Sequence, residues 1–151
     1  MKRALAVLPL LLLAACGGAD AGADAKTGYV GQATKVCEVA KTDADALPRP
    51  TGATDLKAFV DNTVAIAKRA QGELAALTPP TADAADLKSK VLDPFAELVA
   101  QGEAYAKKVD AAGSDQAKLL PLIAAKPTAA GIDLDYLRSY GLGVCADAID
   151  N

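Results

Sequence analysis

Histidine and tryptophan are absent from this 151-residue chain, and only four tyrosines and two phenylalanines supply aromatic side chains. Without histidine the chain lacks the commonest general base and the commonest ligand of transition metals, so no metal or other cofactor is expected. Hydrophobic residues still make up 52% of the chain, and many are alanine. Because alanine favours helix and adds little volume, this composition predicts one narrow all-α domain.

Basic residues are also scarce, since 16 lysines and arginines stand against 19 aspartates and glutamates. This balance argues against DNA or RNA binding, which depends on releasing counterions from phosphates. It argues equally against a polybasic contact with anionic lipid headgroups. No nucleic-acid partner is therefore expected.

Long apolar runs are missing except near the start, where Lys2 and Arg3 precede an almost wholly apolar stretch over residues 4–13. A charged start followed by roughly 7–15 apolar residues is the pattern of a secretory signal peptide. The stretch is too short to span the roughly 30 Å of bilayer hydrocarbon as a helix. We therefore expect residues 1–15 to be a signal peptide, whose removal leaves 14 basic against 19 acidic side chains.

The expected signal peptide leads into Leu13-Ala14-Ala15-Cys16. This tetrapeptide resembles the bacterial lipobox, in which the cysteine thiol receives a diacylglyceryl group and the chain is cut just before it. The resemblance implies that Cys16 becomes an N-terminus carrying acyl chains such as palmitate, anchored at the extracytoplasmic face of the cell membrane. The alternative is an ordinary cleavage site with a bystander cysteine. Residues 16–27 are small and polar, and are predicted to form a flexible lipidated tether.

Cysteine is rare, and the two that remain, Cys37 and Cys145, lie near the ends of the expected domain. In an exported protein they are predicted to form one disulfide, which would stabilise the fold by about 4–5 kcal/mol because it closes a long loop. The alternative is a metal or redox pair, but there is no C-x-x-C spacing and no histidine to complete such a site.

Apolar residues recur every three or four positions over four main segments, and proline- or glycine-containing stops separate them. The expected helices cover residues 28–46, the segment from Thr54 to a stop at 78–80, residues 82–109, a segment that begins with Ser114 as N-cap, and a last stretch over 133–140. Pro94 would either kink the third helix or split it with Asp93 as a new N-cap, and the unbroken apolar spacing favours a kink. Residues 28–151 are therefore predicted to form a four-helix up-and-down bundle with kinked helices, closed by the disulfide.

Few residues could carry chemistry. The three serines, Ser89, Ser114 and Ser139, have no G-x-S-x-G or S-x-x-K surroundings. Among several aspartate pairs, Asp133-x-Asp135 is the most plausible Ca²⁺ ligand pair, although helix capping and solubility explain these pairs better. The four tyrosines are Tyr29, Tyr105, Tyr136 and Tyr140. If the disulfide forms, Tyr29, Tyr136 and Tyr140 would cluster near one end of the bundle, as part of the core or as a binding surface.

From Tyr29 to Cys145 the layout resembles small secreted lipoproteins of actinobacteria of uncharacterised function. The matching features are Tyr29 and Cys37, then Leu74-x-x-Leu77-x-Pro79-Pro80, then Gly141-Leu142-x-x-Cys145. A six-residue tail after Cys145, where a final glycine is usual, departs from the pattern. The resemblance implies a helical fold closed by a disulfide, and it carries no catalytic residue across.

The sequence therefore favours a non-enzymatic, membrane-anchored module that binds an unidentified envelope protein or ligand. The alternative is a small-molecule- or lipid-binding lipoprotein with a cavity of roughly 300 Å³ or more between its helices. A third hypothesis, an envelope hydrolase, would need a cleft that holds a strongly shifted carboxylate beside a serine, lysine or tyrosine.

Overall fold

The computed structural model describes residues 20–150. The predicted signal peptide and the lipidation residue Cys16 lie outside this range. Within it the structure is helical and contains no strand, so the predicted all-α class is confirmed. The elements in chain order are α1 (Asp20–Asp45), α2 (Ala53–Ala76), α3 (Ala84–Leu87), the π-helical turn η1 (Lys88–Leu92), α4 (Asp93–Ala112), α5 (Gln116–Ala124), α6 (Leu134–Tyr140) and α7 (Gly143–Asp150).

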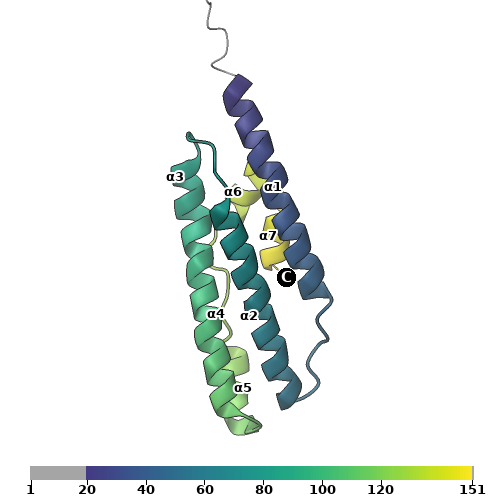
Figure 1. Cartoon of the computed structure of the whole chain (residues 1–151). Helices are drawn as coiled ribbons and strands as arrows, with labels where there is room; N and C mark the ends of the chain where they lie inside the picture. The colour runs from purple at the N-terminus through teal and green to yellow at the C-terminus, as the bar shows by residue number, and fades with distance from the viewer. Residues whose placement is uncertain (1–19, 151) are drawn as a thin grey trace, which may run out of the picture.

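Three long helical rods lie side by side, with α2 between α1 and the continuous run from α3 through η1 to α4 (Figure 1). The short helix α5 packs on α4 at one end of the molecule. The short helices α6 and α7 pack on each other in the other half, where α7 contacts α1. The predicted four-helix up-and-down bundle is therefore not confirmed, because short helices at opposite ends stand where one fourth helix was expected.

The core is correspondingly divided into two clusters of buried side chains. The larger cluster joins α1, α2, the run from α3 through η1 to α4, α6 and α7, and its most buried members include Ala33, Leu87, Leu137 and Ala146. The smaller cluster joins α2, α4 and α5 through Val60, Val109, Ala112 and Leu119. Both are built mainly from aliphatic side chains, as the scarcity of aromatic residues requires.

Helix α1 begins at Asp20, eight residues before the expected start. The flexible tether predicted for residues 16–27 is therefore wrong for residues 20–27, which are helical. The first turns of α1 project beyond the rest of the molecule (Figure 1). The physical reason is that adding residues to an existing helix is far easier than nucleating one, and the segment contains several alanines.

Two predicted N-caps are displaced by one or two positions. Gly52, and not Thr54, precedes the first residue of α2. Asp115, and not Ser114, caps α5, since its carboxylate accepts hydrogen bonds from the backbone N–H groups of Ala117 at 3.0 Å and Lys118 at 3.4 Å. A carboxylate at the positive end of the helix dipole competes well with a neighbouring serine hydroxyl.

Pro94 lies in a continuous helical run, because the backbone stays helical on both sides of it. The preceding turn, η1, is a π-helix in which the N–H of Asp93 donates to the carbonyl oxygen of Lys88. A widened turn accommodates a proline ring that would clash in a regular α-helix. The alternative of a split with Asp93 as a new N-cap is therefore wrong.

The C-terminal segment holds a helix that the sequence did not reveal. Asp133 caps α6 with a 2.8 Å bond from the N–H of Tyr136. Gly141 adopts a left-handed φ of 102° and ends α6, where the N–H of Leu142 donates to the carbonyl of Leu137 at 2.8 Å. This is the Schellman arrangement, which reverses the chain. The chain then forms α7, where only a returning segment was expected.

Leu137 provides a test of the larger core cluster, because only 1% of its surface is exposed. Leu137→Ala should lower the free energy of unfolding by about 2–5 kcal/mol, through lost burial and the cavity left behind. Leu120→Ala is the matched control, since Leu120 is 67% exposed and its truncation should cost less than about 0.5 kcal/mol. Urea unfolding of both variants measures the difference, and equal losses would contradict this packing.

Candidate functional site

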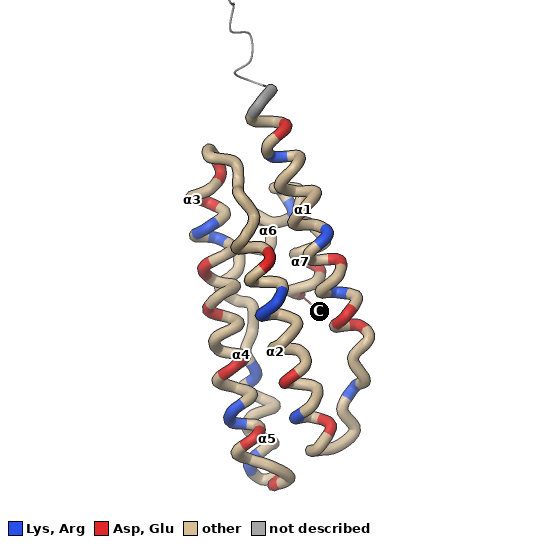
Figure 2. The backbone as a smooth tube through the Cα atoms, in the orientation of Figure 1, with Lys and Arg blue, Asp and Glu red and all other residues tan. Residues whose placement is uncertain are grey.

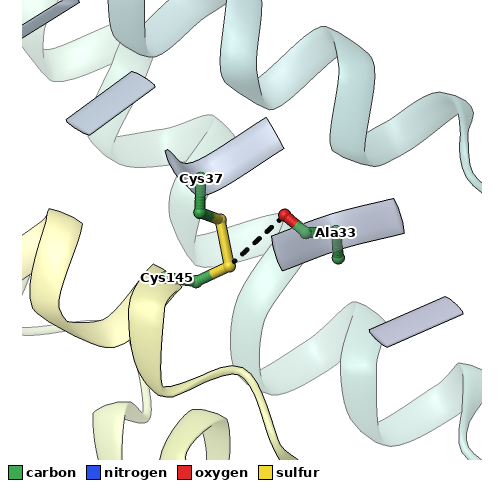
Figure 3. Close-up of a disulfide and its surroundings, with 3 residues drawn as sticks. All are labelled: Ala33, Cys37 and Cys145. Atoms are coloured by element: carbon green, nitrogen blue, oxygen red, sulfur yellow. Dashed lines mark hydrogen bonds between the residues drawn. A yellow bond between two sulfur atoms is a disulfide. The ribbon is translucent and has the colours of Figure 1, made fainter. Parts of the chain in front are cut away.

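The predicted disulfide is present. It joins Cys37 of α1 to Cys145 of α7, with Cα atoms 5.0 Å apart and a sequence separation of 108 residues (Figure 3). Both cysteines are buried in the larger core cluster. The Sγ atom of Cys145 lies 3.7 Å from the carbonyl oxygen of Ala33, a packing contact because a disulfide sulfur has no proton to donate. The bridge therefore serves to hold α7 on α1.

Three tyrosines come together in the larger core cluster, which also contains the bridge, and the sequence predicted this grouping. The ring centroids of Tyr29 and Tyr140 lie 6.3 Å apart in an edge-to-face arrangement, and those of Tyr136 and Tyr140 lie 5.6 Å apart and stacked. Tyr105, in contrast, packs on the smaller core cluster. The chain thus gathers its tyrosines from α1 and α6 into one aromatic group.

Charged groups surround this aromatic group. The hydroxyl of Tyr140 donates to the carboxylate of Asp83 at 2.7 Å, which ties α6 to the turn before α3. The Nζ atom of Lys26 lies 4.1 Å from the ring centroid of Tyr140, and that of Lys90 lies 4.6 Å from the ring centroid of Tyr136. Tyr29 and Tyr140 are buried, and the chain's own lysines contact the rings. The geometry favours the core interpretation over a binding surface.

We expect the stability of the fold to depend on pH through the ionisation of its tyrosines. Burial and the neighbouring Asp83 carboxylate raise the pKa of Tyr140 well above its usual range, and burial also raises the pKa of Tyr29 and of Tyr136. Because a raised folded-state pKa favours the protonated form, this stabilisation is complete below pH ~10, where unfolded tyrosine ionises, and is lost as the pH rises above it.

Tyr140→Phe should therefore flatten the fall of the unfolding free energy above pH ~10 by as much as about 1.4 kcal/mol per pH unit. At neutral pH the variant should lose about 1 kcal/mol with the Asp83 hydrogen bond. Urea unfolding between pH 8 and pH 11, read by circular dichroism, measures both effects. A slope unchanged from that of the wild type would show that Tyr140 is not held protonated.

The other predicted candidates have structural partners. The serine hydroxyls of Ser89 and Ser139 donate to backbone carbonyls of their own helices at 3.0 and 2.9 Å. Asp133 is the N-cap of α6, and Asp135 forms an ion pair with Arg138 at 3.6 Å. Within residues 20–150, no group of three or more acidic or cysteine side chains is placed to hold a metal ion.

The surface of the described residues includes two hollows of about 350 Å³ each. One is open and charged, between α2 and α4, and is lined by Lys57, Asp61, Val64, Glu103, Ala106, Lys107 and Asp110. The other is more enclosed and mainly apolar, and lies between the linker that follows α1 and the first half of α2. Sequence reasoning missed this second cavity, although a proline- or glycine-containing stop was expected after the first helix at residue 46.

Surface chemistry elsewhere is mixed. Acidic and basic residues are interspersed along the three long rods (Figure 2). The large apolar side chains that are most exposed among the described residues are Val39, Leu120 and Ile123, two of them on α5. None of the helices within residues 20–150 combines the length and apolarity needed to cross a bilayer.

The chain matches no protein-family model, and comparisons with curated proteins and with solved structures gave no match.

Proposed function

We propose that this protein is an exported lipoprotein, anchored through Cys16 at the extracytoplasmic face of the cell membrane, whose helical domain binds a ligand or partner and does not catalyse a reaction. The observation that carries this proposal is the Leu13-Ala14-Ala15-Cys16 motif at the end of the chain's one long apolar segment. We also propose, from the sequence features described above, that the protein is related to the small actinobacterial lipoproteins that it resembles.

The disulfide supports export. Stable structural disulfides form in oxidising compartments and are rare in the reducing cytosol. The bridge also accounts for two of the three cysteines, and the third is the one that ends the motif. Under this proposal Cys16 supplies the thiol for acylation, and Cys37 and Cys145 stabilise the fold.

A binding role is supported by the partners of the polar side chains. Nucleophilic catalysis needs a hydroxyl or thiol within reach of a base. Among the described serines, Ser89 and Ser139 donate to their own helices, and Ser114 lies in the turn before α5. None of these serines therefore supports the hypothesis of an envelope hydrolase, whereas the apolar cavity beside α2 favours small-molecule binding as the second candidate function.

Fractionation and protease accessibility test the proposed location. The protein should sediment with membranes from cells that express it, and protease added to intact cells or spheroplasts should degrade it. A cytosolic enzyme measured in the same samples controls for lysis. Protein that stays protected until the cells are lysed would contradict an extracytoplasmic location.

A further inference from the structure

The apolar cavity lies in a part of the molecule that the core does not use. It is about 350 Å³ in volume, near the lower end of the range of small-molecule sites. The linker over residues 46–52 forms one wall and descends beside the first turns of α2 (Figure 1). The lining residues of the cavity include Leu47, Pro48, Arg49, Asp55, Phe59 and Asn62.

The walls of the cavity are held in place by the chain itself. Pro48 and Pro50 restrict the backbone of the linker. Thr51 fixes the end of the linker to α2, because its N–H and its hydroxyl both donate to the carboxylate of Asp55, at 3.2 and 2.7 Å. These bonds lower the pKa of Asp55 and keep its carboxylate engaged. The cavity is therefore largely preformed.

The lining combines an apolar wall with one cation, Arg49, and one carboxylate, Asp55, which is held by Thr51. Phe59, Leu47 and Pro48 supply apolar surface, and Asn62 supplies an amide. The ion pairs of arginines in the described part of the chain involve Arg69 and Arg138, whereas Arg49 has no carboxylate within ion-pair distance. A guanidinium is a planar, always charged donor that matches a carboxylate with two parallel hydrogen bonds.

We propose that this cavity binds a small organic anion, with an aromatic or branched apolar body against Phe59 and Leu47 and a carboxylate at Arg49. The proposal deepens the binding role proposed above and rests on it. The ligand class follows from the complementarity with the apolar lining, the cavity volume and the guanidinium of Arg49, which forms no ion pair among the described residues, whereas the Asp55 carboxylate is already engaged by Thr51.

The test uses the mature lipoprotein in phosphatidylcholine nanodiscs, with 2-naphthoate, its neutral methyl ester and 2-naphthylmethylammonium as probes. NMR titration should shift the backbone amides of residues 47–62, and 2-naphthoate should bind at least about tenfold more tightly than either other probe. Arg49→Gln should weaken 2-naphthoate binding by roughly tenfold, the effect of one charge-assisted hydrogen-bonded contact. Lys108→Gln is the matched control, because it removes one positive charge from an exposed position on α4.

Equal affinity for the three probes, shifts outside residues 47–62, or the same loss in Arg49→Gln and Lys108→Gln would each overturn the proposal. Empty nanodiscs measure partition of the probes into lipid. The acylation state of Cys16 is read separately by mass spectrometry, and the titration can be run on the purified protein whether or not it is acylated. A failure of this site is therefore distinguishable from a failure of the anchor.

Discussion

Replacing Cys37 and Cys145 together by alanine should lower the free energy of unfolding by about 4–5 kcal/mol. The bridge spans 108 residues of sequence, and closing so long a loop removes much of the conformational entropy of the unfolded chain. Because domains are commonly stable by only about 5–15 kcal/mol, the loss is a large share of the total. Thermal unfolding followed by circular dichroism should show a midpoint lower by roughly 15 °C.

The reductant dependence provides the control. The wild-type protein in a strong phosphine reductant should approach the midpoint of the double alanine variant, whereas the variant should not respond to the reductant. Hydrogen exchange should also quicken in α7, since the bridge fixes that helix to α1. A variant that melts within about 2 °C of the wild type would show that helix packing alone holds the C-terminal segment.

Cys16→Ser should abolish acylation and release the mature domain from the membrane. A serine hydroxyl cannot form the thioether that a lipobox cysteine forms. Without two or three acyl chains, the mature domain has no other strong membrane attachment expected from its sequence, since it carries 14 basic against 19 acidic side chains. Membrane pelleting and intact-mass measurement together give the readout.

Gly17→Ser is a suitable control, because it changes the neighbouring residue and leaves the thiol in place. The mass measurement also shows whether residues 1–15 remain attached to Cys16→Ser, so that an uncleaved signal peptide is not mistaken for a lipid. Acyl mass on the Cys16→Ser protein would contradict Cys16 as the lipidation residue.

The features predicted well from the sequence are those fixed by covalent chemistry or by helix-breaking residues. Cys37 and Cys145 could pair only with each other once Cys16 was assigned to the lipid, and the structure confirms their bridge. Gly113 ends α4 with a φ of 57°, where the sequence placed a stop. The tyrosine cluster followed from the bridge, because Tyr140 lies five residues before Cys145.

The features missed depend on competition or on three-dimensional spacing. Asp115 and Ser114 are adjacent potential caps, and only the geometry of the turn selects Asp115. Helix α1 starts early because a helix that is already packed extends easily into the residues before it. The small and polar residues at 20–27 gave no sign of this extension in the sequence. The cavity beside α2 depends on the distance between the proline-containing linker and Phe59. The spacing of apolar residues along a helix does not predict that distance.

Intact-mass spectrometry of protein extracted from the membrane fraction tests the central claim most directly. The account predicts a chain that begins at Cys16, carries the added mass of a diacylglyceryl group, and lacks two thiol hydrogens because Cys37 and Cys145 are bridged. A chain that retains Met1, or one that begins elsewhere and carries no acyl mass, would contradict it.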